Sequence, residues 1–322
     1  MKRSARPQVL VICILLVIAG SAGTGYAQSN TWSNGASIPT PRYGTAFGVI
    51  KGKVYVVAGS TEGYDLVNNN EIYNPTKNKW TTGAPIPTVR WFPASAVVAN
   101  ILYVIGGSQN GTFLNVVEAY DPVTNAWSTK APLPTAANSM YAVSYNGIIY
   151  VVGGCCDASN NRLATVFAYN PAKDSWMERR SLHVGKSNPA LGVLGTTMGT
   201  TIIAAGGYLT DGEVTTDDEI YSPYWNAWKT IAPIPTARTA GCFGVISGSF
   251  YVASGGTHDY IDPVDVLEVY SAKLKTWMTG LAPIPQAVVA PASAVVNKKL
   301  YCIGGVNGVG GVPYPNVQIY QP

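Results

Sequence analysis

A ten-residue phrase recurs along the chain and constrains its fold more than any other feature. Its five copies share a tyrosine at the third position and a tryptophan at the tenth, and they read EIYNPTKNKW (71–80), EAYDPVTNAW (118–127), FAYNPAKDSW (167–176), EIYSPYWNAW (219–228) and EVYSAKLKTW (268–277). An earlier tryptophan, Trp32, precedes them, and successive tryptophans lie 47 to 52 residues apart. A period of this length indicates stacked copies of one supersecondary unit.

Each unit contains four short segments with the composition of β-strands. Residues 90–130 include ASAVVAN, LYVIGG, VVEAY and AWSTK, separated by turn residues such as Asn100 and the DPVTN sequence. One such sheet cannot bury both of its faces, so we expect the copies to stack face to face. Twisted sheets that stack around an axis close into a ring.

A second repeated feature is a glycine pair at the end of an apolar run. It reads YVIGG (103–107), YVVGG (150–154), IAAGG (203–207), YVASGG (251–256) and YCIGG (301–305), and in the first unit it is reduced to YVVAGS (55–60). From residue 31 to the end, these pairs and the tryptophan spacing resemble the kelch repeat family. The resemblance implies an all-β fold, a six-bladed β-propeller of four-stranded antiparallel blades.

The two ends of the repeat array complement each other. The chain enters it at Trp32, in a fourth strand, and leaves it at QIYQP (318–322), in a third strand. We therefore predict that the N-terminal strand completes the last blade and closes the ring, so that no open sheet edge remains.

The first 27 residues have the plan of a secretory signal. Three basic residues precede an apolar run over 9–20, and small residues lead to a predicted cleavage after Ala27. Because that run is shorter than the roughly 20 residues that span a bilayer, we predict cleavage, with an uncleaved anchor as the alternative. The domain is then 28–322, and we expect it outside the cell, in a periplasm or at a cell surface.

The charge of the mature chain excludes one class of partner. Removing residues 1–27 leaves 18 Lys and Arg against 17 Asp and Glu. Such a balance gives no basis for binding nucleic acid.

The links between strands sort onto two faces of a propeller. Tight turns join strands 1 and 2, and strands 3 and 4, on one face, which we call the turn face. The longer, more variable 2–3 and 4–1 links share the other, which we call the loop face. Because variable loops on a rigid scaffold commonly carry binding residues, we place any site on the loop face, at the mouth of the central channel.

Four of the 4–1 links carry a basic residue near the start of the innermost strand: Arg42, Arg90, Lys186 and Arg238. A partial ring of cations at a channel mouth attracts carboxylates, and arginine binds them through paired hydrogen bonds. The kelch resemblance implies the same, because kelch adaptors of animal cells grip acidic peptides with arginines on this face. The alternative is that these residues belong to the repeat and brace adjacent blades.

Aromatic and acidic residues complete the predicted binding set: Tyr43, Tyr64, Trp91 and Asp217. A ring beside the mouth could stack on a sugar or a side chain, and packing between blades is the alternative. The acidic 2–3 loops, including the one with Asp217, lack the spacing of a Ca²⁺ loop, so we predict no metal. Glutamates that recur in strand 3 are expected to be architectural: Glu71, Glu118, Glu219 and Glu268.

Four cysteines follow the predicted cleavage site. Cys155 and Cys156 open a 2–3 loop, where an oxidising export route favours a vicinal disulfide. Cys242 and Cys302 lie in apolar strands, where a small buried thiol is the expected state. None has a histidine at metal-ligand spacing, and we predict no cofactor.

The sequence favours a binding module over an enzyme. Kelch-related copper oxidases use two histidines in one site, whereas the two histidines of this chain, His183 and His258, fall in different units. The enzymatic alternative is a fold similar to sialic acid mutarotase (N-acetylneuraminate epimerase), with an acid–base pair such as Asp217 and Arg238; it rests on shared architecture alone. We therefore predict a secreted monomer without catalytic residues that binds a protein, an acidic peptide or a glycan.

Overall fold

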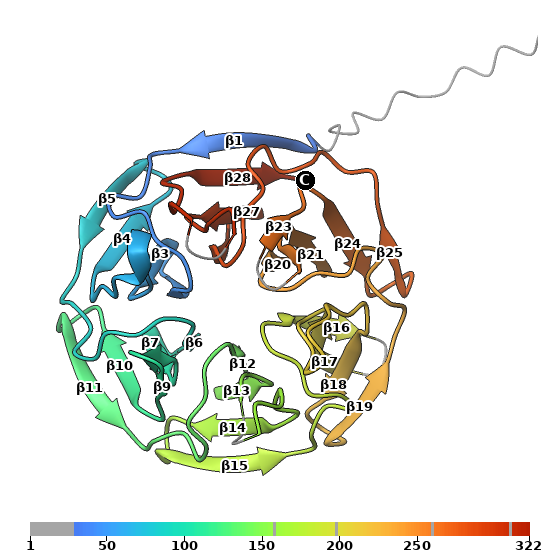
Figure 1. Ribbon diagram of the computed structural model, residues 1–322, viewed down its shortest axis with the longest axis horizontal. Coiled ribbons are helices and arrows are strands. Elements are labelled where there is room, and N and C mark those ends of the chain that lie inside the picture. Colours follow the sequence, from blue (N-terminus) through green and yellow to red (C-terminus); the bar gives the residue numbers. More distant parts are fainter. Residues whose placement is uncertain (1–28, 157–158, 197–198, 259–260, 309–310) are drawn as a thin grey trace, which may run out of the picture.

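The computed structural model describes residues 29–156, 159–196, 199–258, 261–308 and 311–322. Within these ranges, six four-stranded antiparallel sheets are arranged as a ring around a central axis (Figure 1). The predicted all-β, six-bladed propeller is confirmed. The predicted signal segment, residues 1–27, lies outside the described residues.

The first three blades follow the chain in order. Blade 1 contains β2 (Ala46–Ile50), β3 (Lys53–Val57), β4 (Asn70–Asn74) and β5 (Lys79–Thr82). Blade 2 contains β6 (Ala94–Val98), β7 (Ile101–Ile105), β10 (Val117–Asp121) and β11 (Ala126–Lys130). Blade 3 contains β12 (Tyr141–Tyr145), β13 (Ile148–Val152), β14 (Val166–Asn170) and β15 (Ser175–Arg179).

The last three blades complete the ring. Blade 4 contains β16 (Ala190–Thr196), β17 (Gly199–Ala205), β18 (Glu219–Ser222) and β19 (Ala227–Thr230). Blade 5 contains β20 (Cys242–Ile246), β21 (Ser249–Ala253), β24 (Leu267–Ser271) and β25 (Thr276–Met278). Blade 6 contains β26 (Ala292–Val296), β27 (Lys299–Ile303), β28 (Val317–Gln321) and β1 (Thr31–Gly35).

Three of the 2–3 loops carry small elements that the sequence patterns did not predict. A 3₁₀ turn, Glu62–Tyr64, lies in the loop of blade 1. The loop of blade 2 contains the hairpin β8 (Ser108–Gln109) and β9 (Thr112–Phe113), and that of blade 5 contains β22 (Gly256–His258) and β23 (Ile261–Pro263). These elements lie on the loop face and give each loop a different shape.

The ring closes as predicted. Strand β1 pairs antiparallel with β28, which places Trp32 opposite Tyr320, with ring centroids 5.2 Å apart. Figure 1 shows β1 as the outermost strand beside β28. The first strand of the chain therefore supplies the fourth strand of the last blade.

The repeated glycines follow from close backbone approach. Gly106 and Gly107, at the end of β7, both have positive φ, at 60° and 101°. A Cβ on Gly106 would lie 2.6 Å from the carbonyl oxygen of Ala137, which belongs to the next 4–1 link. Glycine is therefore required where the 2–3 loop passes under the neighbouring link.

A repeated latch joins adjacent blades in five of the six seams, our term for the contacts between neighbouring blades. In the blade 1–blade 2 seam, the indole Nε1 of Trp127 donates to the carbonyl of Ala84 at 2.9 Å, and the amide of Ala84 donates to Oδ1 of Asn125 at 2.7 Å. The Tyr120 hydroxyl donates to the same oxygen at 2.6 Å. Four other seams have an equivalent latch residue, two positions before the tryptophan: Asn30, Asn78, Asp174 and Asn226.

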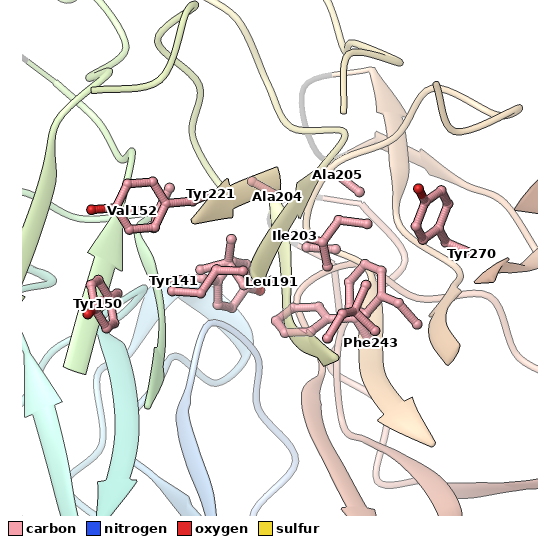
Figure 2. Packing of buried hydrophobic residues seen from close by; sticks show 14 of the residues in the cluster. Tyr141, Tyr150, Val152, Leu191, Ile203, Ala204, Ala205, Tyr221, Phe243 and Tyr270 are labelled. Carbon is pink, nitrogen blue, oxygen red and sulfur yellow. The ribbon is translucent and has the colours of Figure 1, made fainter. Parts of the chain in front are cut away.

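Apolar side chains fill the seams behind the latches. Figure 2 shows buried residues of blades 3, 4 and 5 packed together, among them Tyr150, Leu191, Ile203 and Phe243. Burial of this apolar area between sheets is the main favourable term in the stability of the ring. In the part of the chain that the structure describes, no helix has the length and apolar character that crossing a bilayer requires.

We expect Asn125→Ala to lower the free energy of unfolding by about 2–3 kcal/mol, because two donors lose their acceptor. Asn110→Ala is the matched control: Asn110 has a similar φ, 49° against 51°, but lies in the exposed turn between β8 and β9. It should cost less than about 1 kcal/mol. Urea unfolding followed by tryptophan fluorescence measures both, and equal losses would contradict a role for the latch.

Candidate functional site

The central channel is lined mainly by apolar side chains of the described innermost strands. The innermost strands surround a cavity of about 370 Å³, and Ser144 and Ser293 are the polar side chains in its lining. Phe47, Tyr141 and Phe243, from blades 1, 3 and 5, contact one another with ring centroids 4.9–6.2 Å apart. Neither a carboxylate, a histidine nor a cation occurs among the described residues that line this cavity.

Six backbone hydrogen bonds close the channel at the loop face. In each 4–1 link, one amide donates to the carbonyl of the corresponding residue in the preceding blade, at 2.7–3.2 Å, through Gly44, Phe92, Ser139, Asn188, Ala240 and Ala290. All six have positive φ, between 47° and 61°. The cavity at this hydrogen-bonded ring measures about 10 Å³, which is room for at most one water. The predicted channel mouth is therefore sealed, and a ligand on this face contacts the loops around it.

The predicted basic ring lies inside the blades and not on the surface. The side chains of Arg42, Arg90, Lys186 and Arg238 are 0–2% exposed. Each faces a carboxylate of its own blade: Arg42–Glu71, Arg90–Glu118, Lys186–Glu219 and Arg238–Glu268. The expectation that these four cations bind an acidic ligand is corrected, because they do not reach solvent.

The buried cations instead hold the bases of the 2–3 loops. Nη1 of Arg90 donates to the carbonyls of Gly106 at 3.0 Å and Val116 at 2.9 Å, which flank the loop of blade 2. Burial lowers the pKa of Arg90, and the charge of Glu118 opposes that shift. Burial likewise lowers the pKa of Arg238 to about 10, so it is still protonated at neutral pH.

Blades 3 and 6 show that the cation and its carboxylate act as a unit. Blade 3 has Ala137 and Phe167 at the two positions, and blade 6 has Val288 and Gln318. In both blades the cation and the carboxylate are absent together. This agrees with the high cost of burying an unpaired charge, and it confirms the architectural role predicted for the strand-3 glutamates.

Aromatic rings from blades 1 and 2 form a cluster on the loop face. Trp91 contacts Tyr43, Tyr64 and Phe92, with ring centroids 6.0, 5.8 and 5.1 Å apart. Tyr43 is buried, Trp91 and Phe92 are partly buried, and Tyr64 is 49% exposed. The structure thus brings three predicted site residues together and adds Phe92. Its position directly after Trp91 in the sequence could have indicated that it belongs to this cluster.

A second group lies at the loop of blade 3. Cys155 and Cys156 form a vicinal disulfide. Nη1 of Arg162 lies 2.9 Å from the sulfur of Cys155 and 2.7 Å from that of Cys156, and its guanidinium carbon lies 4.9 Å from the ring centroid of Tyr208. Cys155 and Arg162 are partly exposed. Sequence reasoning missed Arg162, although it lies in the loop that the two cysteines open.

Hydrogen bonds connect the aromatic cluster to the disulfide. Trp91 and Ser108 exchange two backbone hydrogen bonds, and Nδ2 of Asn138 donates to the Ser108 hydroxyl at 3.0 Å. Asn138 and Cys155 exchange two further backbone hydrogen bonds. We call this linked row of loop-face residues the loop-face strip: Tyr64, Trp91, Phe92, Asn138, Cys155, Cys156 and Arg162.

Exposed charge differs between the two faces. Exposed carboxylates occupy the 2–3 loops, at Glu62, Asp65, Asp211, Glu213, Asp217, Asp262 and Asp265. Exposed lysines occupy the turns of the opposite face, at Lys51, Lys77, Lys173, Lys273, Lys275 and Lys298. The loop face was predicted to attract an acidic partner, and the exposed side chains of its 2–3 loops that are charged are mainly carboxylates.

The proposed acid–base pair of the enzymatic alternative is not formed. The guanidinium of Arg238 is buried and bonds to Glu268 and to the carbonyl of Val266. The side chain of Asp217 is exposed, and its backbone carbonyl accepts a hydrogen bond from Lys186. No group of three or more potential metal ligands occurs among the described residues.

Cys242 and Cys302 were predicted to be buried free thiols, and the structure corrects this. They form a disulfide with a Cα–Cα distance of 5.7 Å. Cys242 starts β20 of blade 5 and Cys302 lies in β27 of blade 6, so the bond crosses a seam. The apolar sequence around each cysteine correctly predicted that both are buried. Their disulfide could not be predicted, because it depends on which residues of neighbouring blades face each other.

Asp218 is a buried carboxyl in the blade 4–blade 5 seam. Its Oδ1 accepts a hydrogen bond from the amide of Gly206, and its Oδ2 accepts one from Nε1 of Trp277, both at 2.9 Å. Burial raises its pKa from 3.8 to about 7, although these hydrogen bonds and Lys186 act in the opposite direction. Its charge therefore changes close to neutral pH.

The raised pKa of Asp218 predicts how stability changes with pH. Between about pH 4 and pH 7 the unfolded chain has lost the Asp218 proton and the folded chain keeps it, so this group lowers stability as pH rises. Because Asp218→Asn cannot ionise, we expect its stability relative to wild type to increase by about 4 kcal/mol between pH 4 and pH 8, which is the free energy that corresponds to the rise in pKa from 3.8 to about 7. Chemical denaturation across that range measures the difference.

Asp217→Asn is the matched control, because Asp217 is the exposed neighbour. Its stability curve should run parallel to that of the wild type. A parallel curve for Asp218→Asn as well would show that Asp218 is ionised throughout this range, against the prediction.

The fold, its loops and its repeat define a class of protein, the kelch-type β-propeller. Residues 26–207 match the model of the KLHDC2/KLHL20/DRC7 Kelch-repeats domain. The chain belongs to the kelch-repeat family.

Individual relatives match over shorter stretches. Kelch-like protein 33 of Homo sapiens is 31% identical over 90 residues, which is 28% of this chain and 16% of that protein. Kelch-like protein 35 of Mus musculus is 31% identical over 116 residues, which is 36% of this chain and 20% of that protein. The chain thus spans a fifth or less of the length of these curated relatives.

A solved structure agrees over most of the chain. The structure of YjhT superimposes with a TM-score of 0.73 and 18% sequence identity, covering 87% of this chain and 95% of that one. At this identity the likeness supports the fold.

Proposed function

We propose that this chain is a secreted protein-interaction module that binds a peptide segment of a partner protein across the loop-face strip. The observation that carries the proposal is the strip itself, in which one exposed and two partly exposed aromatic rings are linked by hydrogen bonds to a partly exposed disulfide. Kelch-repeat membership supports an interaction role.

The composition of the strip suits side chains of mixed character. Tyr64 and Trp91 offer ring faces that pack against apolar groups and attract cations. Nδ2 of Asn138 donates to the Ser108 hydroxyl, and its Oδ1 is buried, so Asn138 positions the strip and does not bind a peptide amide through that oxygen. The strip can therefore hold apolar and cationic side chains of an extended segment.

The charge of the partner follows from the surrounding loops. Glu62 and Asp65 flank Tyr64, and Asp211 and Glu213 lie in the loop of Tyr208. With Arg42, Arg90, Lys186 and Arg238 buried, these carboxylates dominate the exposed charge of the 2–3 loops. We therefore assign a segment with lysine or arginine side chains, and we replace the acidic peptide of the sequence-based hypothesis.

The test compares two sets of short peptides of equal length, each built around an apolar residue. One set carries lysine and arginine, and the other carries glutamate. Fluorescence anisotropy should show binding of the basic set and weakening with added salt. Trp91→Ala should weaken binding by about tenfold or more, as expected for a central aromatic anchor.

Trp225→Ala is the matched control, because Trp225 is 70% exposed in a strand 3–4 turn of blade 4, away from the strip. It should change affinity by less than about twofold. Equal losses in the two variants, or a preference for the glutamate set, would contradict the proposal. Sugar binding with accelerated anomer exchange in NMR spectra would favour the enzymatic alternative instead.

We also propose that residues 1–27 direct export and are removed. The two disulfides support this, because such bonds persist in oxidising compartments. Expression in a secreting host should release a chain that begins at Gln28, as read by mass spectrometry of the N-terminal peptide. Retention of residues 1–27 on a membrane-bound product would contradict it.

A further inference from the structure

Blade 5 departs from the latch that joins the other seams. The latch residue stands two positions before the repeated tryptophan, and in blade 5 that residue is Lys275. A lysine ammonium only donates, so it cannot accept the hydrogen bond that Asn125 accepts in blade 2. Lys275 also has φ at +57°, a conformation in which asparagine and aspartate are enriched. Both features make lysine a poor structural choice at this position.

A pocket of about 220 Å³ lies where the latch is missing, between blades 4 and 5 on the turn face. Its apolar lining includes Leu194, Ile220 and Ile231 of blade 4, and Ala272 of blade 5. The lining also includes Ala232, Tyr270 and two lysines, Lys229 and Lys275. Figure 2 shows Tyr270 at the blade 5 side of the buried cluster.

The pocket presents a backbone amide and a tyrosine hydroxyl, which are the two groups that donate to the latch oxygen in other seams. In blade 3 the latch residue is an aspartate, and Oδ1 of Asp174 accepts hydrogen bonds from the amide of Ala131, at 2.8 Å, and from the hydroxyl of Tyr169. Ala232 and Tyr270 occupy the corresponding positions in the blade 4–blade 5 seam. A carboxylate oxygen is thus an established acceptor for this pair of donors within the same chain.

We propose that this pocket binds a small organic carboxylate with an aromatic or aliphatic body. The carboxylate takes the place of the missing latch oxygen and accepts from the amide of Ala232 and the hydroxyl of Tyr270. Lys229 and Lys275 supply the compensating positive charge, and the apolar walls enclose the body of the ligand. The site lies on the face opposite to the loop-face strip and does not depend on that strip's function.

A second cavity, in blade 3, has similar cations, but its hydrogen-bond donors already have protein partners. It measures about 290 Å³ and is also lined by cations, including Lys173 and Arg179. Arg179, however, already donates to the hydroxyl of Tyr221 at 3.1 Å and to the carbonyl of Pro223 at 3.2 Å. The latch of the blade 3–blade 4 seam is also occupied, by Asn226, whose Oδ1 accepts from the amide of Arg180 and the hydroxyl of Tyr221. The donors are therefore satisfied in blade 3, whereas the blade 4–blade 5 seam lacks a protein acceptor at the latch position.

The test uses para-fluorophenylacetate and its neutral isostere para-fluorophenylacetamide, titrated into the full chain and followed by fluorine NMR. The acid should bind at least about tenfold more tightly than the amide, because only the acid carries the charge that the lysines compensate. Equal affinities, or no binding by the acid, would overturn the proposal.

The decisive variant is Lys275→Asn, which restores the latch of the other blades. It should weaken binding of the acid at least about tenfold and raise the melting temperature by about 2–4 °C, because the seam gains its missing hydrogen bonds. Lys273→Asn, an exposed lysine of the same turn that does not line the pocket, is the matched control and should leave both values unchanged.

The rise in melting temperature separates loss of the site from loss of the fold. If Lys275→Asn binds the acid as tightly as wild type does, the pocket is not the binding site and the proposal fails. If Lys273→Asn weakens binding equally, the effect comes from the net charge of the turn, and the proposal also fails.

Discussion

The ring depends on the contact between neighbouring blades. A four-stranded sheet of this composition has two apolar faces, and each is covered only when another blade packs against it. The latch orients that packing, because in five of the six seams one residue of a blade, such as Ala84, has both its amide and its carbonyl bound by the next blade. Closure by β1 extends the same contact to the last seam, so the fold has no terminal blade with an uncovered face.

The loop face shows how architecture can resemble a binding site. Arginine beside a channel mouth fits an anion site by its chemistry, but here it faces a glutamate two strands away in the same blade. The cost of burying a charge is offset by that partner and by loop carbonyls, so the pair organises the 2–3 loops. The residues that our proposal assigns to ligand contact are ones that break the repeat, such as Trp91 and Arg162.

The loop face and the turn face differ in the charged residues that they expose. Each face carries the residues that the seams do not require: carboxylates in the variable loops, and lysines in the tight turns. Where a turn residue does belong to a latch, its replacement leaves a cavity and unmatched donors, as at Lys275. A repeat therefore helps to locate sites, because a departure at a structural position needs an explanation that a variable loop does not.

The sequence by itself determined the number of blades, their strands, the ring closure and the architectural glutamates. These depend on spacing and local composition, which recur near every tryptophan and glycine pair. It also placed Tyr43, Tyr64 and Trp91 on one face, because strand order decides the face. Only the tertiary structure decided that Arg90 is buried, that Cys242 bonds to Cys302, and that Asn138 joins Trp91 to the disulfide. Those outcomes depend on packing between blades that are distant in sequence, and that packing sets which side chains face each other and which reach water.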